Sequence, residues 1–176
     1  MNEADRYYEL VKGGREHFLA ETADAALLRR RDQPLKPAEP DKSDTEGFGD
    51  IETNVGVAAE LHRELVADPG LYEVYPLVKK PGAAFAAKIT VGRTQNNDVV
   101  FNDVTVSRFH AYLRPSSNDW QVCDAGSKNG TCLGGQKLPA RRETAIAAGT
   151  SIRFGDVETV FYTADLLFDI LDSTAS

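Results

Sequence analysis

The sequence predicts a mainly β protein: a β-sandwich of two antiparallel sheets, preceded by a helical extension and followed by a short helix. Two observations predict this fold class. The spacing of apolar residues changes near residue 70 from a helical period to a strand-like period. Beyond that point, short runs rich in β-branched and aromatic residues recur about every ten residues, separated by Gly, Asn, Asp and Pro, which is typical of a sandwich.

Residues 1–70 are expected to form an acidic helical extension that contains a linker. Apolar residues recur at helical spacing through residues 1–31: Tyr7, Leu10, Val11, Phe18, Ala25 and Leu28. Gly13-Gly14 interrupts this pattern, which leaves either one broken helix or two short helices. The Pro-rich, acidic composition of residues 32–50 indicates a linker. A second helical pattern covers residues 51–65 and ends at the turn signal Asp68-Pro69-Gly70.

Residues 71–165 are expected to form the sandwich. Seven runs in this region have strand character: Leu71–Val78, Phe85–Val91, Asp98–Phe101, Phe109–Arg114, Trp120–Asp124, Ser151–Phe154 and Glu158–Tyr162. The stretch Ala164–Leu171 has the pattern of a short amphipathic helix, so residues 166–176 are assigned to a C-terminal helix and tail.

The charge of the chain is divided unevenly along its length. The net charge is −7. Residues 1–70 hold 9 Lys and Arg against 16 Asp and Glu, whereas residues 71–176 hold 11 against 11. An acidic chain argues against broad binding to nucleic acids or to anionic membranes, so we expect neither partner. A local basic site remains open in the neutral half.

Two cysteines, Cys123 and Cys132, are too few and wrongly spaced for a disulfide framework or a zinc site. We expect both cysteines to be small, buried or half-buried strand residues. We also expect a cytoplasmic protein, in which the thiols are reduced. Apolar runs stay short of the roughly 18–20 residues that a membrane span needs. We expect neither a metal nor a cofactor, because the sequence shows no metal-ligand cluster and no nucleotide-binding loop.

Three segments between predicted strands combine small, turn-permitting residues with strong hydrogen-bond donors. They are Gly92-Arg93, Ser107-Arg108-Phe109-His110 and Asp124-Ala125-Gly126-Ser127-Lys128-Asn129-Gly130-Thr131. Loops at one end of a sandwich can converge on one site. Arg93 offers two parallel N–H groups to phosphate oxygens, and Ser107 adds a hydroxyl. Arg108 and Lys128 add positive charge, which suits a dianionic phosphate ester.

Together the three segments resemble the signature of the forkhead-associated (FHA) domain: Gly-Arg after a strand, then Ser-Arg-x-His, then Asp-x-Gly-Ser-x-Asn-Gly-Thr. They stand in the order typical of that family, and the resemblance covers residues 71–165. It implies an eleven-stranded β-sandwich whose apical loops bind phosphothreonine peptides. The partners it implies are phosphothreonine-containing proteins, with Ser/Thr kinases or their substrates among them.

The resemblance also implies roles for individual residues. Arg93 and Ser107 are expected to contact the phosphate, Arg108 to lie near it, and Asn129 to bond the peptide backbone. A supporting set is expected to hold the loops in place: Gly92, His110, Gly130 and Thr131. Lys128 departs from the family pattern, which often has Thr or Ser before the Asn. It either attracts phosphate or acidic residues, or points to solvent.

Two other functions compete with phosphopeptide recognition. Ser107, His110 and Asp124 contain the groups of a hydrolase triad, but Ser and His three residues apart on a strand edge point to opposite faces. We therefore expect no enzyme. A structural or assembly protein would use the sandwich as a docking platform, with the helical extension as its main interface. That extension is also a candidate for self-association. Thr45, in the acidic linker, would bind the chain's own pocket if a kinase phosphorylated it.

Overall fold

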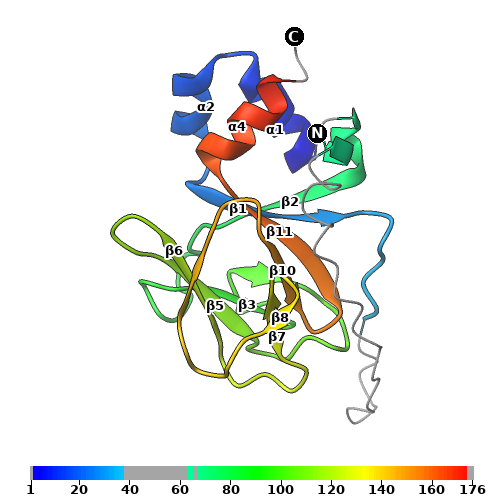
Figure 1. The fold of residues 1–176 in the computed structure, drawn as a ribbon, viewed down its shortest axis with the longest axis vertical. Helices are drawn as coiled ribbons and strands as arrows, with labels where there is room; N and C mark the ends of the chain where they lie inside the picture. Colours follow the sequence, from blue (N-terminus) through cyan, green and yellow to red (C-terminus); the bar gives the residue numbers. More distant parts are fainter. Residues whose placement is uncertain (1, 38–62, 66, 174–176) are drawn as a thin grey trace.

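The computed structural model describes residues 2–37, 63–65 and 67–173. These residues form two packed β-sheets with a helical layer at one end (Figure 1). The helices are α1 Glu3–Val11, α2 Arg15–Glu21 and α4 Ala164–Asp172, with a 3₁₀ turn η1 Pro69–Leu71. The strands are β1 Ala25–Arg30, β2 Tyr72–Pro76, β3 Ile89–Gly92, β4 Val99–Val100, β5 Ala111–Pro115, β6 Trp120–Asp124, β7 Thr131–Leu133, β8 Gln136–Lys137, β9 Thr144–Ile146, β10 Ser151–Phe154 and β11 Val157–Thr163.

The fold class predicted from the sequence is confirmed. One sheet has six strands in the order β2-β1-β11-β10-β7-β8, and the other has five in the order β4-β3-β5-β6-β9. All pairs are antiparallel except β3 and β4, which run parallel with Val91 opposite Val99. The apolar residues between the sheets form one core, which includes the fully buried Leu27, Leu113 and Phe161.

The prediction that Ala25 and Leu28 continue a helical pattern is wrong, because both lie in strand β1. This strand pairs with β11 on one side and β2 on the other, so the sandwich begins well before residue 71. Both faces of β1 are covered: Leu27 packs into the core between the sheets, and Leu28 packs under the helices. A strand buried on both faces is continuously apolar instead of alternating, and such a run cannot be distinguished from a helix by its period.

The three helices cover the outer face of the six-stranded sheet at one end of the molecule (Figure 1). The break predicted at Gly13-Gly14 produces two short helices, and Gly14 has φ of 87° before α2. Phe18 is fully buried and meets Tyr7 and Phe168 edge-on, with ring centroids 5.7 and 5.5 Å apart. Burying such a side chain contributes about 1.5–3 kcal/mol, so α1, α2 and α4 pack firmly on the sandwich. The predicted helix over Ala164–Leu171 is confirmed as α4.

All seven predicted strands have counterparts in the structure: the bounds of β6 and β10 match the prediction, and the other five are shortened, lengthened or shifted. Strands β1, β7, β8 and β9 were not predicted. Most of the helical pattern over residues 51–65, most of the linker over residues 32–50, and Thr45 lie outside the described residues. Cys123 and Cys132 are buried in β6 and β7 with free thiols, as expected. In the part of the chain that the structure describes, no helix has the length and apolar character to cross a membrane.

Candidate functional site

The three motif-bearing loops meet at the end of the sandwich opposite the helices (Figure 1). The backbone N–H of Arg93, after β3, donates to the carbonyl oxygen of Ser107 across 3.0 Å. The backbone N–H of Lys128, after β6, donates to the Ser107 hydroxyl oxygen across 3.1 Å. The Asn129 side-chain amide donates to the carbonyl oxygen of Thr105 across 2.8 Å. The segment around Ser107 therefore lies between the other two loops and joins them.

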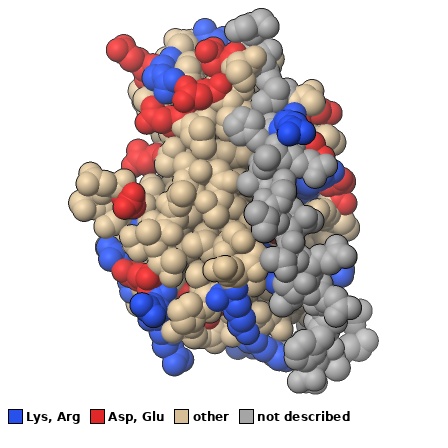
Figure 2. Space-filling view, viewed as in Figure 1, with Lys and Arg blue, Asp and Glu red and all other residues tan. Residues whose placement is uncertain are grey.

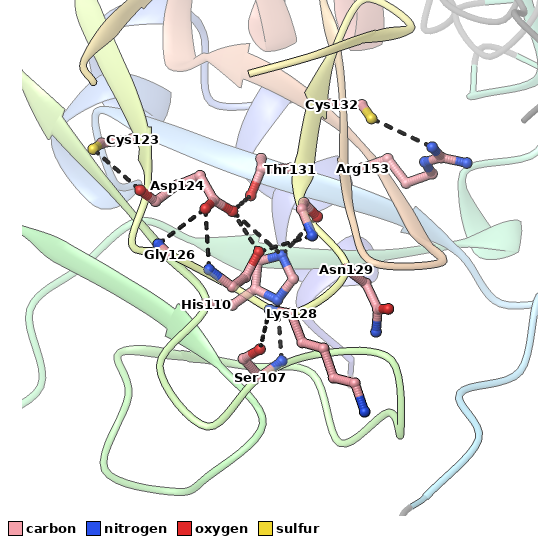
Figure 3. Close-up of polar contacts among 12 residues, drawn as sticks. Ser107, His110, Cys123, Asp124, Gly126, Lys128, Asn129, Thr131, Cys132 and Arg153 are labelled. Carbon is pink, nitrogen blue, oxygen red and sulfur yellow. Dashed lines mark hydrogen bonds and ion pairs between the residues drawn. The ribbon is translucent and has the colours of Figure 1, made fainter. Parts of the chain in front are cut away.

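His110 is the buried centre of this arrangement. Its Nδ1 accepts the backbone N–H of Ser107 at 3.1 Å, and its Nε2 lies 2.9 Å from the carbonyl oxygen of Gly130. Because Nδ1 accepts, Nε2 carries the ring proton and donates. Burial lowers the pKa of His110 below its usual value, and this effect exceeds the opposing influence of the Gly130 carbonyl and the Asp124 carboxylate. The neutral ring thus holds two of the loops together (Figure 3).

Asp124 organises the third loop. One carboxylate oxygen accepts the backbone N–H groups of Gly126 and Ser127 at 2.9 and 3.0 Å, and the other accepts the hydroxyls of Ser127 and Thr131 at 2.5 and 2.7 Å (Figure 3). Burial raises the pKa of Asp124, but these hydrogen bonds outweigh burial and hold it below its usual value. The loop that carries Lys128 and Asn129 is therefore folded around a buried carboxylate.

Gly92 is required because there is no room for a side chain at this position, and not because of its backbone angles. A Cβ at this position would lie 2.2 Å from the carbonyl oxygen of Arg108 and 2.5 Å from the side-chain nitrogen of Asn97. That amide nitrogen donates to the Arg108 carbonyl at 2.6 Å, so the two loops touch directly above Gly92. Gly130 is different, since its φ of 81° strains any side chain, and a Cβ would meet Lys137 Cε at 2.7 Å.

The remaining motif residues carry the charge and polarity of the site surface. Arg93 is half-buried, whereas Arg108, Lys128 and Asn129 are exposed. The Lys128 side chain extends away from the cluster of His110 and Asp124 (Figure 3). Lys and Arg side chains gather at this end of the molecule, whereas acidic side chains are frequent at the helical end (Figure 2). The site therefore has a positive surface although the chain is acidic.

Sequence reasoning assigned no role to Asn97 or Thr105 and did not recognise the holding role of Asp124. Asn97 and Thr105 act through contacts with loop backbone, and contacts of that kind leave no periodic pattern in the sequence. The spacing Asp124-x-Gly-Ser was the one available signal, because a short acidic side chain two residues before a Gly is typical of a turn that accepts its own backbone N–H groups.

The FHA domain family model matches residues 89–155, the segment that contains all three loops. The oxoglutarate dehydrogenase inhibitor of Corynebacterium diphtheriae is 30% identical over 139 residues, which cover 68% of this chain and 95% of that protein. The glycogen accumulation regulator GarA of Mycobacterium tuberculosis is 35% identical over 74 residues, 42% of this chain and 44% of that protein. The chain spans less than half the length of the first relatives that it matches.

A solved structure, Mycobacterium tuberculosis EmbR in complex with a low affinity phosphopeptide, is 27% identical over 52% of this chain and 22% of that chain, with a TM-score of 0.44. The fold and the loops define an eleven-stranded β-sandwich with a polar, positively charged site at one end. The chain belongs to the FHA domain family.

Proposed function

We propose that this protein binds phosphothreonine-containing segments of other proteins through the loops around Arg93, Ser107 and Asn129. The observation that carries the proposal is the Ser107 hydroxyl, which accepts the Lys128 backbone N–H at 3.1 Å. A hydroxyl that accepts in this way still has its own proton to donate. Ser107 is thereby oriented between the Arg93 loop and the Lys128 loop, in a suitable position for a phosphate oxygen.

The chemistry favours the phosphorylated form of a ligand. A phosphothreonine carries a charge of about −1.5 to −2 at pH 7 and has three acceptor oxygens. Hydrogen bonds to a charged group contribute about 1.5–3 kcal/mol each. An Arg93 guanidinium and the Ser107 hydroxyl acting together would distinguish phosphothreonine from threonine by several kcal/mol, since the unmodified side chain offers a single neutral hydroxyl.

Asn129 suits a role in gripping the peptide backbone. One of its two amide N–H groups is engaged by the carbonyl oxygen of Thr105, which fixes the side-chain orientation. A primary amide has a second N–H and a carbonyl oxygen, and these complement the C=O and N–H groups of an extended peptide. Selection of peptide sequence would then come from residues beyond the phosphate contacts.

Binding without catalysis is the function that the geometry supports. Both ring nitrogens of His110 are engaged with backbone groups, at 3.1 Å to Ser107 and 2.9 Å to Gly130. His110 is therefore not placed to take the proton of the Ser107 hydroxyl, as a nucleophile and base pair would require. The Asp124 carboxylate holds its own loop rather than orienting this histidine.

The names of two relatives, a regulator and an inhibitor, support a regulatory role. We propose that this role belongs to a pathway run by Ser/Thr kinases, because these enzymes produce phosphothreonine. Four points stay predictions. They are binding to a phosphorylated partner protein, the involvement of a Ser/Thr kinase, a cytoplasmic location, and self-association through the helical extension.

Binding of the chain's own linker stays a prediction too. One observation favours it. Lys36 donates its N–H to Asp103 at 2.8 Å and accepts the N–H of Val104 at 2.7 Å, so the chain after β1 reaches the loop end of the sandwich. Thr45 lies eight residues beyond Pro37, which are able to span up to about 27 Å. Mass spectrometry of the protein from kinase-active cells tests whether Thr45 is modified.

An oriented phosphothreonine peptide library, screened beside its unphosphorylated counterpart, tests the proposal. We expect binding that requires the phosphate. The absence of any phosphate-dependent binder would contradict the proposal and favour the alternative of a docking platform whose pocket is unused.

A further inference from the structure

Two aromatic side chains stack on one another at the surface beside the candidate site. The rings of Phe85 and Phe109 have centroids 5.8 Å apart and planes 15° apart. Phe85 is 55% exposed and Phe109 is 40% exposed. Single exposed apolar residues are ordinary, but a contiguous apolar surface rimmed by charge is typical of an interaction site.

The pair adjoins the loops that carry Arg93 and Ser107. Phe109 follows Ser107 and Arg108 directly in the sequence. Phe85 belongs to the connection between β2 and β3, and Lys80 of that connection contacts the Arg93 loop. The Lys80 backbone N–H donates to Asp98 at 2.8 Å, and its ammonium lies 3.5 Å from the carbonyl oxygen of Gln95. The aromatic pair and the phosphate-binding loops therefore form one continuous surface.

Phe85 is held in place by a locked connection. The Lys79 ammonium donates to the Asp98 carboxylate at 2.7 Å and to the carbonyl oxygen of Lys88 at 2.8 Å, and it also contacts the carbonyl oxygen of Ala84. The Asp98 side chain has no exposed surface. Its carboxylate also accepts the backbone N–H of Thr90 at 2.8 Å, which fastens the connection to strand β3.

The backbone of Phe85 is strained. Its φ is 61°, in the left-handed region that a bulky side chain rarely adopts. Such strain persists only where the surrounding structure imposes it, and strained residues gather at ligand-binding sites. A glycine at position 85 would adopt this φ without strain, and it would leave no aromatic ring exposed. An exposed phenylalanine at this angle therefore indicates a use for its side chain.

A positive charge lies beside the pair, and a negative charge, Glu143, accepts the nearby Tyr112 hydroxyl at 3.0 Å. The Lys88 ammonium lies 5.7 Å from the centre of the Phe85 ring and 4.2 Å from that of Tyr112. Arg108 is exposed and directly precedes Phe109, which adds a second positive charge beside the pair. Positive groups beside an apolar surface complement a segment that carries phosphate next to an apolar side chain.

We propose that Phe85 and Phe109 form a specificity site for an aromatic or branched aliphatic side chain that flanks the phosphothreonine in the partner protein. This inference rests on the proposed function, because the phosphate at Arg93 and Ser107 would place the flanking residue over the rings. The stacked pair then selects among phosphorylated segments, whereas Arg93 and Ser107 select for the phosphate.

The experiment screens a phosphothreonine peptide library, randomised at the flanking positions, against the full chain and three variants. Phe109→Ala and Phe85→Gly remove the two rings, and the glycine also tolerates a φ of 61°, so this variant keeps the fold. Leu71→Ala is the matched control, since Leu71 is an exposed apolar residue, 38% exposed, in η1 at the helical end. Thermal melts of each variant report folding.

We expect the wild-type chain and Leu71→Ala to enrich aromatic or branched aliphatic residues at one flanking position. Phe109→Ala and Phe85→Gly should lose this enrichment and bind the selected peptides roughly 5- to 20-fold more weakly. All four proteins should bind a peptide with alanine at that position alike. Phosphate-dependent binding with unchanged selection in both ring variants would overturn this inference and leave the proposed function standing. Absence of phosphate-dependent binding to any of the proteins would overturn both.

Discussion

The backbone N–H of Ser107 donates to Nδ1 of His110 across 3.1 Å, and this bond sets the protonation state of a buried histidine. A protonated ring would turn Nδ1 into a donor facing another donor. The loop geometry around the candidate phosphate contact therefore depends on a neutral His110.

The pKa of His110 should lie below the ordinary value of 6.5, because burial disfavours the charged ring. The unfolded chain then takes up the proton first as pH falls. The contribution of His110 to stability is complete above about pH 6.5 and declines below it. Titration of the His110 ring signals by nuclear magnetic resonance measures this pKa directly. A midpoint at or above 6.5 would contradict the assigned hydrogen bonds.

Asp124→Asn should destabilise the protein by about 1–3 kcal/mol, because an amide replaces one acceptor with a donor among four hydrogen-bond donors. Denaturant unfolding measures the change. Asp119→Asn is the matched control, since Asp119 is exposed immediately before β6 and should tolerate the change with little effect. Equal stability of the two variants would show that Asp124 does not organise the loop.

Phe85→Gly should be more stable than Phe85→Ala by about 1–2 kcal/mol, because only glycine adopts a positive φ without a steric penalty. The comparison removes the same aromatic ring twice, so lost stacking cancels. Thermal melts of the two variants provide the test. Equal melting temperatures, or a more stable alanine variant, would contradict the strained backbone at Phe85.

The sequence is sufficient to predict most of the sandwich, since strands such as β6 and β10 have the period and turn boundaries that half-buried strands require. It fails at β1, because the run from Ala25 to Leu28 is apolar on both faces and carries no alternation. It also fails at β7 to β9, which are two or three residues long. So few residues cannot establish a period.

The motif residues of the candidate site could be proposed from the sequence, because donors and glycines at fixed spacing are visible without the fold. The supports of the site were less visible. The Asn97 side-chain amide donates to the backbone carbonyl oxygen of Arg108. Because every residue type has such a carbonyl, the sequence does not reveal which residue Asn97 contacts. The Phe85 and Phe109 pair joins residues 24 positions apart through a backbone angle that sequence patterns do not reveal.

Arginine should be specifically required at position 93. Lysine keeps the positive charge but lacks the planar pair of N–H groups, so Arg93→Lys should bind phosphothreonine peptides poorly. The affinity of both Arg93→Lys and the wild type should fall with added salt, because the attraction is electrostatic. Isothermal titration at two salt concentrations tests this prediction. Full affinity in Arg93→Lys would show that charge alone suffices.

The most direct test is the affinity of one library-selected phosphothreonine peptide, measured by fluorescence anisotropy against the wild-type chain, Arg93→Ala and Lys12→Ala. Lys12→Ala removes an exposed positive charge immediately after α1, at the helical end, and serves as the control. We expect Arg93→Ala to weaken binding at least about 30-fold and Lys12→Ala to leave it unchanged. Undiminished affinity in a folded Arg93→Ala variant would contradict the assignment of the site.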